Sequence, residues 1–449
     1  MGKGVATPKK EIKMKKTALL LFAALLAILC FVSCNKQTEL SPNSPVTLTM
    51  WHVYGEQADS PMNRLVEEFN HTEGAAKGII INVTSMSNAS QIGPQLLDAQ
   101  ANVPGAIDMP DLFFCHSNNA AALGVENLLD WKDYFTEDEM KAYVPEFVED
   151  GMVGDALAVF PVSKSTHLLF VAGGQFERFS KDTGVTYDTL ATWDGFFTAA
   201  EKYHAWSGGK PFCAIDYLLR CVELNAMSKG AADFMSDNGW YDFSNEKLMA
   251  SWEEFACAIA KGHVVVSDMY SNTQVMTGEV VCGIGSSASI LYYNDTITYE
   301  DNTKETMQLS VCPLPQPIDG KKLVTQAGVG LCAYKTTSQK AEAAVVFAKW
   351  LTESDRNLAF VAETGYMPVH NGAFESIGTY EFKNEAYASL YAALTRTKEN
   401  CTAVSEPSIG GYYNKVNALY AGLRTMQKEL PADTATFVNE SIELFKSVG

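Results

Sequence analysis

The 449-residue sequence contains none of the short motifs that build a common catalytic or metal centre. It has no Cys-x-x-Cys pair, HExxH helix, Walker A loop or EF-hand loop. The segment most similar to a nucleophile elbow is Gly283–Ser287, and it lacks the G-x-S-x-G spacing. Gly328 and Gly330 lack the third glycine of a dinucleotide fingerprint, so we interpret them as a close backbone approach at a strand. These absences favour binding over catalysis, and we expect no enzymatic activity, no cofactor and no metal.

Positive charge is scarce. The chain has 34 Lys and Arg against 53 Asp and Glu, which gives a net charge of −19. Residues 1–33 hold six Lys and one Glu, so the remainder of the chain is near −24. Nucleic-acid binding needs clustered Lys and Arg facing phosphates, and a peripheral membrane contact needs a polybasic surface. The charge balance therefore argues against both kinds of partner.

The ten cysteines do not form the spaced framework of a disulfide-stabilised domain. Several lie inside apolar runs such as VVCGIG and VGLCAY, where cysteine behaves as a small buried hydrophobe. Cys213 and Cys221 are the one local pair whose bonding merits a test. We therefore expect most of the thiols to serve packing.

A long apolar run, TALLLFAALLAILCFV, follows the basic segment KKEIKMKK near the N-terminus. This order is typical of a signal peptide, and the run is short for a membrane-spanning helix. Ser33 before Cys34 resembles a bacterial lipobox, which predicts a lipoprotein signal peptide over residues 1–33 and lipid on Cys34. Cys30 is a weaker lipidation candidate, and an uncleaved N-terminal anchor is the plainer alternative. Residues 34–45, rich in Ser, Asn and Pro, are predicted to form a flexible lipidated tether.

The 449 residues are too many for one ordinary hydrophobic core, and 47% of them are apolar, so we expect two lobes. Val46–Val53 and residues 78–86 are β-rich runs. A helix between them is predicted to begin at Pro61, with Ser60 as its cap. A third apolar strand is predicted at 110–114. This alternation of strand and helix predicts an α/β fold with a largely parallel sheet.

Residues 337–370 predict two helices and then a stop. Ser338 and Ser354 are the candidate caps of the two helices. Gly365 is placed to end the second helix in a left-handed conformation, and the proline three residues later prevents continuation. The loop then presents Tyr366, either as a hydrophobic contact that closes the helix end or as a ring for a ligand.

The turn formed by Thr364, Gly365, Tyr366 and Pro368 resembles the corresponding turn of ABC-transporter extracellular solute-binding proteins of family 1. That family includes maltose-like sugar binders and glycerol-3-phosphate binders. Similar elements occur earlier in the chain. They are a first strand that ends in Trp51, the sequence PDLF at 110–113, and the pair Thr192-Trp193 before a later helix. The resemblance extends from Val46 to the C-terminus and is loose in the last part of the chain.

The resemblance implies an α/β, two-lobed periplasmic-binding-protein fold of type II with three interlobe crossings. The implied lobe 1 is formed by residues 46–161 and 317–366, and lobe 2 by residues 162–316 and 367–449. The first crossing would follow Pro161, where the chain reads Ser-Lys-Ser-Thr, and the second would lie at Leu314–Pro317. The third would follow Pro368. Between the crossings, residues 207–247 are expected to form loops and a short helix.

The resemblance also implies a function. The protein would capture a carbohydrate by hinge closure and deliver it to ABC permease subunits in the membrane. It would be a monomer, anchored by lipid on the periplasmic or cell-surface side of a bacterial membrane. Glycerol-3-phosphate or a glycerophosphodiester is the alternative solute, but His116 replaces an acidic residue of that branch, and the segment at 408–414 lacks its Arg. A lipid-anchored surface enzyme or an adhesin is the alternative outside the family.

Polar and aromatic residues in the loops that match the family's cleft are the candidate ligand contacts. Sugar C–H faces lie well on aromatic rings, while sugar hydroxyls need hydrogen bonds. The set is Trp51, His52, Ser87, His116, Ser117, Ser165, Tyr217, Trp240, Tyr241, Ser287, Gly328, Tyr366 and Tyr412. Each has an ordinary structural role as its alternative, and Trp51 in particular could instead close the end of the sheet.

Overall fold

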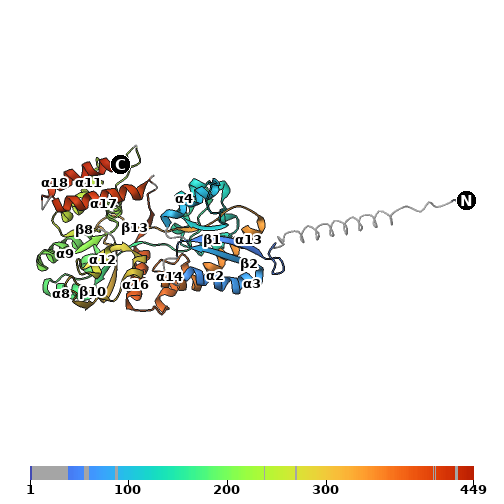
Figure 1. Cartoon of the computed structure of the whole chain (residues 1–449), viewed down its shortest axis with the longest axis horizontal. Coiled ribbons are helices and arrows are strands. Elements are labelled where there is room, and N and C mark those ends of the chain that lie inside the picture. The colour runs from blue at the N-terminus through green and yellow to red at the C-terminus, as the bar shows by residue number, and fades with distance from the viewer. Residues whose placement is uncertain are drawn as a thin grey trace.

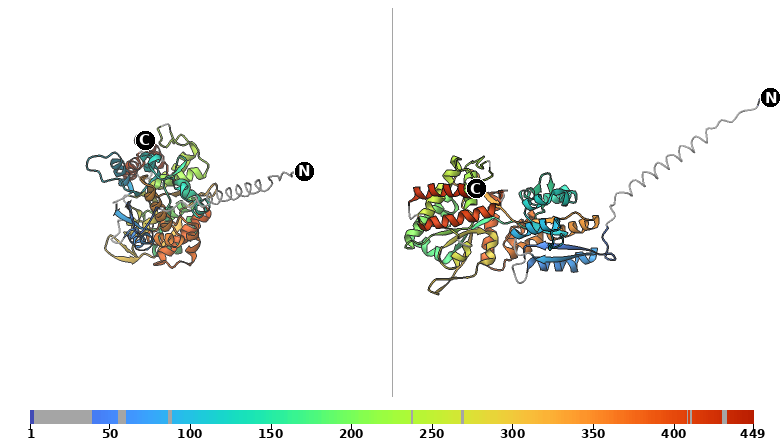
Figure 2. Two further views of the ribbon diagram at one scale, coloured as in Figure 1. Left: turned by 90° about the vertical axis from the view of Figure 1, so that its right-hand side faces the viewer. Right: turned by 45° about the horizontal axis from the view of Figure 1, so that its top comes forward.

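The computed structural model of the chain describes residues 1–2, 39–54, 60–85, 89–236, 238–267, 270–407, 409, 411–429 and 433–449. Two lobes lie side by side along the longest axis of the molecule (Figures 1 and 2). None of the helices within the described ranges is long and apolar enough to cross a membrane. Residues 3–33 of the predicted signal peptide, together with Cys34 and Ser87, fall outside the described residues.

Lobe 1 is built on a four-stranded sheet with the order β14-β3-β1-β2. Its strands are β1 (Val46–His52), β2 (Ile79–Ser85), β3 (Leu112–Cys115) and β14 (Gly330–Ala333). β1 runs parallel to both β2 and β3, which confirms the predicted parallel unit, whereas β14 joins β3 antiparallel. The sequence pattern around residues 46–114 did not predict that β14, from much later in the chain, would form an edge of this sheet.

Helices cover this sheet and complete the core of lobe 1 (Figure 1). They are α2 (Pro61–His71), α3 (Glu73–Lys77), α4 (Ala89–Gln100), α5 (Ser117–Leu123), η1 (Val125–Asn127), η2 (Trp131–Asp133), α6 (Glu137–Lys141), α7 (Pro145–Asp150), α13 (Ser338–Leu351), α14 (Ser354–Thr364), α15 (Asn371–Ser376) and η5 (Ile377–Thr379). A short hairpin is formed by β4 (Met152–Val153) and β5 (Ala156–Leu157). As predicted, Pro61 opens α2, and the Ser60 hydroxyl accepts a hydrogen bond from the Asn63 amide at 3.3 Å.

Two of the predicted helix caps are displaced by one residue. The Thr337 hydroxyl caps α13 by accepting from the Lys340 amide at 3.2 Å, so Ser338 is the first helical residue. Glu353 occupies the N-cap of α14 without a side-chain cap bond. The C-terminal prediction is confirmed, because Gly365 ends α14 in the left-handed region with φ 75°.

Lobe 2 is built on a five-stranded sheet with the order β12-β6-β9-β7-β8. Its strands are β6 (His167–Ala172), β7 (Cys213–Ile215), β8 (Val264–Val266), β9 (Cys282–Ser286) and β12 (Leu309–Pro313). β7 is parallel to β8 and β9, and β6 is antiparallel to β9 and β12. A separate hairpin is formed by β10 (Thr296–Thr298) and β11 (Lys304–Thr306).

The helices of lobe 2 pack around this sheet, with α17 and α18 on its outer side (Figure 1). They are α8 (Gly173–Thr183), η3 (Asp188–Ala191), α9 (Trp193–Trp206), α10 (Leu218–Ser228), α11 (Glu246–Ala260), α12 (Ser271–Met276), η4 (Ser287–Tyr292), α16 (Glu385–Asn400), α17 (Tyr412–Glu429) and α18 (Thr434–Val448). The expectation of loops and a short helix at 207–247 is partly wrong, because this stretch contains β7 and the eleven-residue α10. Nearly all of α10 is buried, so its sequence lacks the amphipathic period that signals a surface helix.

The lobes are joined by segments that are far apart in the sequence. β13 (Leu323–Gln326) pairs in parallel with β15 (Thr402–Ser405), with Gln326 opposite Ser405. The crossing segment 162–166 bridges to both other connections, because Ser165 pairs with Ala327 and Lys164 pairs with Met367. We call the segments 162–166, 325–328, 365–369 and 402–406 the interlobe junction.

The contacts of two segments suggest later lobe boundaries than the sequence pattern does. The Lys321 amide donates to the Ser228 carbonyl of lobe 2 at 3.1 Å, and Leu323 packs in the lobe 2 core. The Asn371 amide donates to the Ala142 carbonyl of lobe 1 at 2.8 Å. We therefore propose that the second crossing lies near residue 326 and that the third follows α15.

Candidate functional site

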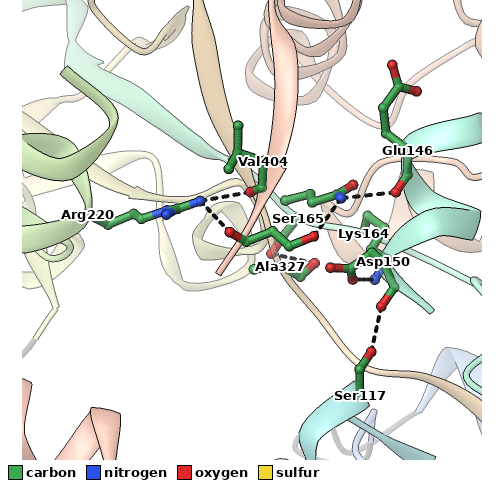
Figure 3. A network of polar contacts seen from close by, with 10 residues as sticks. Ser117, Glu146, Asp150, Lys164, Ser165, Arg220, Ala327 and Val404 are labelled. Atoms are coloured by element: carbon green, nitrogen blue, oxygen red, sulfur yellow. Dashed lines mark hydrogen bonds and ion pairs between the residues drawn. The ribbon is translucent and has the colours of Figure 1, made fainter. Parts of the chain in front are cut away.

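The first crossing is a polar segment that is nevertheless buried. The side chains from Ser163 to Thr166 are at most 8% exposed. Buried polar backbone must find hydrogen-bond partners, and here it finds them on the other connections. The Ser165 amide donates to the Ala327 carbonyl at 2.8 Å, and the Lys164 amide donates to the Met367 carbonyl at 3.2 Å. The predicted residue Ser165 therefore lies at the centre of the junction (Figure 3).

An ion pair fixes this crossing to lobe 1. The Lys164 ammonium group, 2% exposed, binds the carboxylate of Asp150 at the end of α7. The Ser117 hydroxyl donates to the Asp150 carbonyl at 2.6 Å (Figure 3). Burial, with a further contribution from Lys164, lowers the pKa of His116 to about 4, so its imidazole is neutral at pH 7. The predicted pair His116 and Ser117 thus lies next to the junction. The Lys164 cation beside this pair is already neutralised by Asp150.

On the lobe 2 side, Arg220 of α10 holds the end of β15. Its Nη2 donates to the carbonyls of Val404 and Ser405 at 2.8 and 2.7 Å (Figure 3). Its Nη1 donates to Glu223 Oε2 at 2.8 Å. Its Nε donates to the Thr325 hydroxyl at 3.1 Å. The predicted residue Tyr241 joins the cluster by donating to Glu223 Oε2 at 3.1 Å. The buried guanidinium is thus occupied by the junction itself.

Gln326 continues the same network to lobe 1. Its side-chain Nε2 donates to the Ser405 hydroxyl and to the Glu146 carbonyl of α7, both at 3.0 Å (Figure 3). Its Oε1 is buried and has no hydrogen-bond partner within the described part of the chain. One amide therefore links both lobes, and its oxygen is buried without a partner among the described residues.

Aromatic rings and carboxylates gather around Tyr217, which precedes α10. The His167 ring stacks on Tyr217 with centroids 3.9 Å apart, and burial lowers the pKa of His167 to about 3. Burial also raises the pKa of Tyr217, and Asp216, Glu406, Tyr270 and Tyr366 lie within electrostatic range of its hydroxyl. Tyr217 and Tyr366, which were predicted from segments far apart in the sequence, therefore lie within electrostatic range of each other.

The two carboxylates of this group are half-buried. Burial raises the pKa of Asp216 to about 6, although Asp216 accepts hydrogen bonds from the Ser271 amide and hydroxyl at 2.6 and 2.9 Å. Burial likewise raises the pKa of Glu406, which accepts a hydrogen bond from the Tyr413 hydroxyl at 2.9 Å. Both carboxylates follow β-strands, which is the signal that could have found them in the sequence.

Tyr366 belongs to a second aromatic group on lobe 1. Its ring centroid lies 5.9 Å from that of Tyr54, in an edge-to-face arrangement, and its carbonyl accepts from the Tyr391 hydroxyl at 2.8 Å. The Tyr54 hydroxyl in turn lies 3.0 Å from the Ser163 hydroxyl of the first crossing. Tyr54 was not predicted as a site residue.

Three predicted residues lie inside the lobes. Trp51 is 2% exposed within a cluster of apolar side chains. Both ring nitrogens of His52 are used within lobe 1, with Asn63 Oδ1 at 2.7 Å and the Tyr54 amide at 3.1 Å. The Trp240 indole donates to the Phe445 carbonyl at 2.9 Å in the lobe 2 core. We leave these three out of the ligand set that we propose, because packing already accounts for them.

The remaining predicted residues lie beside the junction. Gly328 has φ 119°, and a Cβ there would lie 3.5 Å from the Ser163 carbonyl oxygen. The Ser287 amide donates to the Thr166 carbonyl at 2.8 Å, and its buried hydroxyl has no partner among the described residues. Tyr412 lies within electrostatic range of Glu223, Arg220 and Glu406.

The thiols and metal-ligand types of this region form no further centre. The cysteines within the described ranges are free, including Cys213 and Cys221. Among the described residues, no group of three or more His, Cys, Asp or Glu side chains could hold a metal ion. The junction therefore offers hydrogen bonds, rings and carboxylates.

These features are those of an extracellular binding protein with two α/β lobes. Residues 64–387 match the family model described as bacterial extracellular solute-binding protein, and the chain belongs to this family. No curated protein matches the sequence significantly.

Solved structures of binding proteins share the fold. The cyclic alpha-maltosyl-1,6-maltose binding protein from Arthrobacter globiformis superposes with a TM-score of 0.67 at 15% identity, covering 90% of this chain and 99% of that one. The sugar-binding protein MalE from Xanthomonas citri gives a TM-score of 0.67 at 15% identity, with 90% and 97% covered. UgpB from Mycobacterium tuberculosis in complex with glycerophosphocholine gives 0.66 at 15% identity, with 90% and 98% covered. The two-lobed fold expected from the sequence is thereby confirmed.

Proposed function

We propose that this protein is the substrate-binding component of an ABC importer and that it captures a carbohydrate between its lobes. The structural neighbours include binders of maltose derivatives and a structure with bound glycerophosphocholine, so the fold is compatible with both solute classes. The choice between them depends on the chemistry of the junction. We infer the class of solute from the charges and the hydrogen-bonding groups of the junction.

The observation that carries the proposal is that the cations of the junction are already paired. Lys164 binds Asp150, and Arg220 binds Glu223 together with two backbone carbonyls. His116 is neutral at pH 7 because of its lowered pKa. A phosphate brings only acceptors and negative charge, and it needs cations or free amide donors. The half-buried carboxylates of Asp216 and Glu406 are acceptors, and acceptors suit the many hydroxyl donors of a saccharide.

Hinge closure would give the solute contacts from both lobes at once. Tyr217 belongs to lobe 2, whereas Tyr366 packs with the aromatic group of lobe 1. A solute that contacts both rings binds the closed form more tightly than the open form, and this difference drives closure. The closed protein would then deliver its solute to the permease subunits. We further propose that it acts as a lipid-anchored monomer, with lipid on Cys34, on the extracytoplasmic side of a bacterial membrane.

A thermal-shift and intrinsic Trp-fluorescence screen of the purified protein against saccharides and glycerophosphates tests the function. We expect stabilisation by one or more saccharides and none by glycerol-3-phosphate. Tyr366→Ala should abolish the response, whereas Tyr134→Ala, at an exposed tyrosine away from the junction, should keep it. Stabilisation by glycerol-3-phosphate alone would overturn the carbohydrate proposal. Cleaved product after incubation with an oligosaccharide would indicate the lipid-anchored enzyme instead.

A further inference from the structure

Two cysteines from distant parts of the chain are in contact inside lobe 1. Cys115 ends β3, and Cys332 lies in β14, 217 positions later. Their sulfur atoms are 3.6 Å apart, and both residues are 0% exposed. The antiparallel register places Cys115 opposite Gly330 and Cys332 opposite Phe113. Because side chains alternate along a strand, both thiols lie on the same face of the sheet.

A second pair of cysteines in lobe 2 shows what is particular about this contact. Cys213 and Cys282 lie opposite each other on β7 and β9. The Cys213 thiol donates to the Ala214 carbonyl at 3.4 Å, and the Cys282 thiol donates to the Phe212 carbonyl at 3.3 Å. Each thiol of lobe 2 is therefore bound to a backbone carbonyl. In lobe 1, by contrast, the two thiols form a hydrogen bond with each other.

The local structure allows the two sulfur atoms of lobe 1 to come closer. A disulfide bond is about 2.0 Å long, so a bond requires an approach from the present contact distance. Gly330, directly opposite Cys115, has no side chain that could lie between Cys115 and its diagonal neighbour Cys332. β14 is also an edge strand of its sheet, so no strand on its other side opposes a small shift toward β3.

The compartment and the burial of the thiols indicate when a bond would form. The family is extracellular, and disulfides form and persist in oxidising extracytoplasmic compartments. In the folded sheet, burial raises the pKa of the Cys332 thiol well above its ordinary value, so the reactive thiolate is scarce there. Before β14 pairs with β3, both thiols are open to solvent. Oxidation must therefore accompany the docking of β14.

We propose that Cys115 and Cys332 are a modification site, oxidised to a disulfide during folding, and that this bond joins the edge strand β14 to β3. The oxidant is an external disulfide. One cysteine thiolate attacks it and releases a first thiol, and the second cysteine thiolate then attacks the mixed disulfide and releases a second thiol. The two protons of the cysteines end on the released thiols, and the oxidant takes up the two electrons.

The bond would lie beside the interlobe junction. His116 and Ser117 follow β3 directly, and Gly328 of the second crossing lies just before β14. The disulfide would therefore hold together two segments of lobe 1 that lead to the candidate site. It would also close a loop of more than two hundred residues, and the stabilisation by a disulfide increases with the length of the loop that it closes.

Peptide mapping of the full chain tests the proposal. The reduced protein is unfolded in urea and refolded with oxidised glutathione, its remaining free thiols are alkylated, and its digest is analysed by mass spectrometry. We expect a linked pair of peptides that contain Cys115 and Cys332. The thermal transition of this oxidised protein should lie about 5 °C above that of protein refolded with a reductant.

Cys115→Ala should remove the linked peptides and make the transition temperature independent of the oxidant. Cys257→Ala is the control, because it removes a half-buried thiol of α11 in lobe 2, and it should keep both effects. If Cys115→Ala fails to fold, the peptide map of the unaltered protein decides. Complete alkylation of Cys115 and Cys332 after oxidative refolding would overturn the proposal, as would linkage of either residue to another cysteine. Linked protein without a raised transition temperature would overturn the stabilising role of the bond.

Discussion

Tyr366 owes its position to the residue before it. Gly365 ends α14 in the left-handed region, so the chain turns sharply and the tyrosine emerges beside Tyr54 instead of continuing the helix. The glycine is also packed closely, because a Cβ at this position would lie 2.9 Å from the Ser287 carbonyl oxygen and would meet the Ile290 side chain. One residue thus sets both the end of a helix and the ring that faces lobe 2.

Gly365→Ala is expected to lower the free energy of unfolding by about 2–4 kcal/mol, since left-handed backbone and overpacking both penalise a side chain there. The measurement is urea unfolding followed by Trp fluorescence. Gly378→Ala is the matched control, because Gly378 has no neighbour within 4 Å of an added Cβ and no positive φ. Equal losses in the two variants would contradict the role assigned to Gly365.

At the scale of elements, β15 is held by a side chain from a helix nearly two hundred positions away. Arg220 of α10 reaches the carbonyls of Val404 and Ser405 across a sequence separation of 184 and 185 residues. Glu223 balances the buried guanidinium at 2.8 Å. β13 and β15 form a sheet of only two strands, so this fixation matters more than it would in a larger sheet.

Arg220→Met is expected to reduce the free energy of unfolding by about 3 kcal/mol or more, because Glu223 is left as a buried charge without a partner. The double variant Arg220→Met/Glu223→Gln should lose less than the single variant, since the unpaired charge is gone and an acceptor for Tyr241 remains. A double-mutant cycle by urea unfolding provides the measurement. A double variant that is less stable than the single one would show that the ion pair is not the origin of the effect.

At the scale of the whole molecule, two lobes, each with its own sheet, are joined by several segments, and the hydrophobic cluster of lobe 1 also takes in side chains of β6, β12 and α16. The connections include the backbone bridges at Lys164 and Ser165, the β13–β15 pair, the Gln326 amide and the hydrogen bond from the Tyr391 hydroxyl of α16 to the Tyr366 carbonyl. Segments of this kind can act as hinges about which the lobes rotate. The consequence is a change of overall shape when solute binds.

The radius of gyration from small-angle X-ray scattering is expected to fall when a binding saccharide is added, because closure brings the lobes together. The control is Tyr366→Ala, which should show no change at the same saccharide concentration. Binding detected by calorimetry without any change in the radius of gyration would contradict hinge closure.

Local signals were enough to predict much of the fold. Ser60 with Pro61, Thr192 before α9 and Gly365 after α14 act within one helical turn, and the structure confirms all three. The helical period predicts only part of the buried face of α13, because Phe347 and Trp350 are buried as well as Ala344 and Ala348. The same local signals predicted the residues of the candidate site less well. A strand that ends in Trp51 and His52 indicates an edge of the sheet, but the local pattern does not tell whether these side chains point to solvent or into the core.

The sequence by itself determined the α/β class, the first strands and their parallel order, the ends of key helices and the acidic character of the chain. Folding was needed to show that Arg220 is occupied by β15, that Lys164 is neutralised by Asp150, and that Glu406 and Tyr366 lie within electrostatic range of Tyr217. The physical reason is the separation along the chain between the residues that interact. Caps and periodicity depend on neighbours within a few residues, whereas the charge of a binding site depends on partners brought together from distant segments by folding.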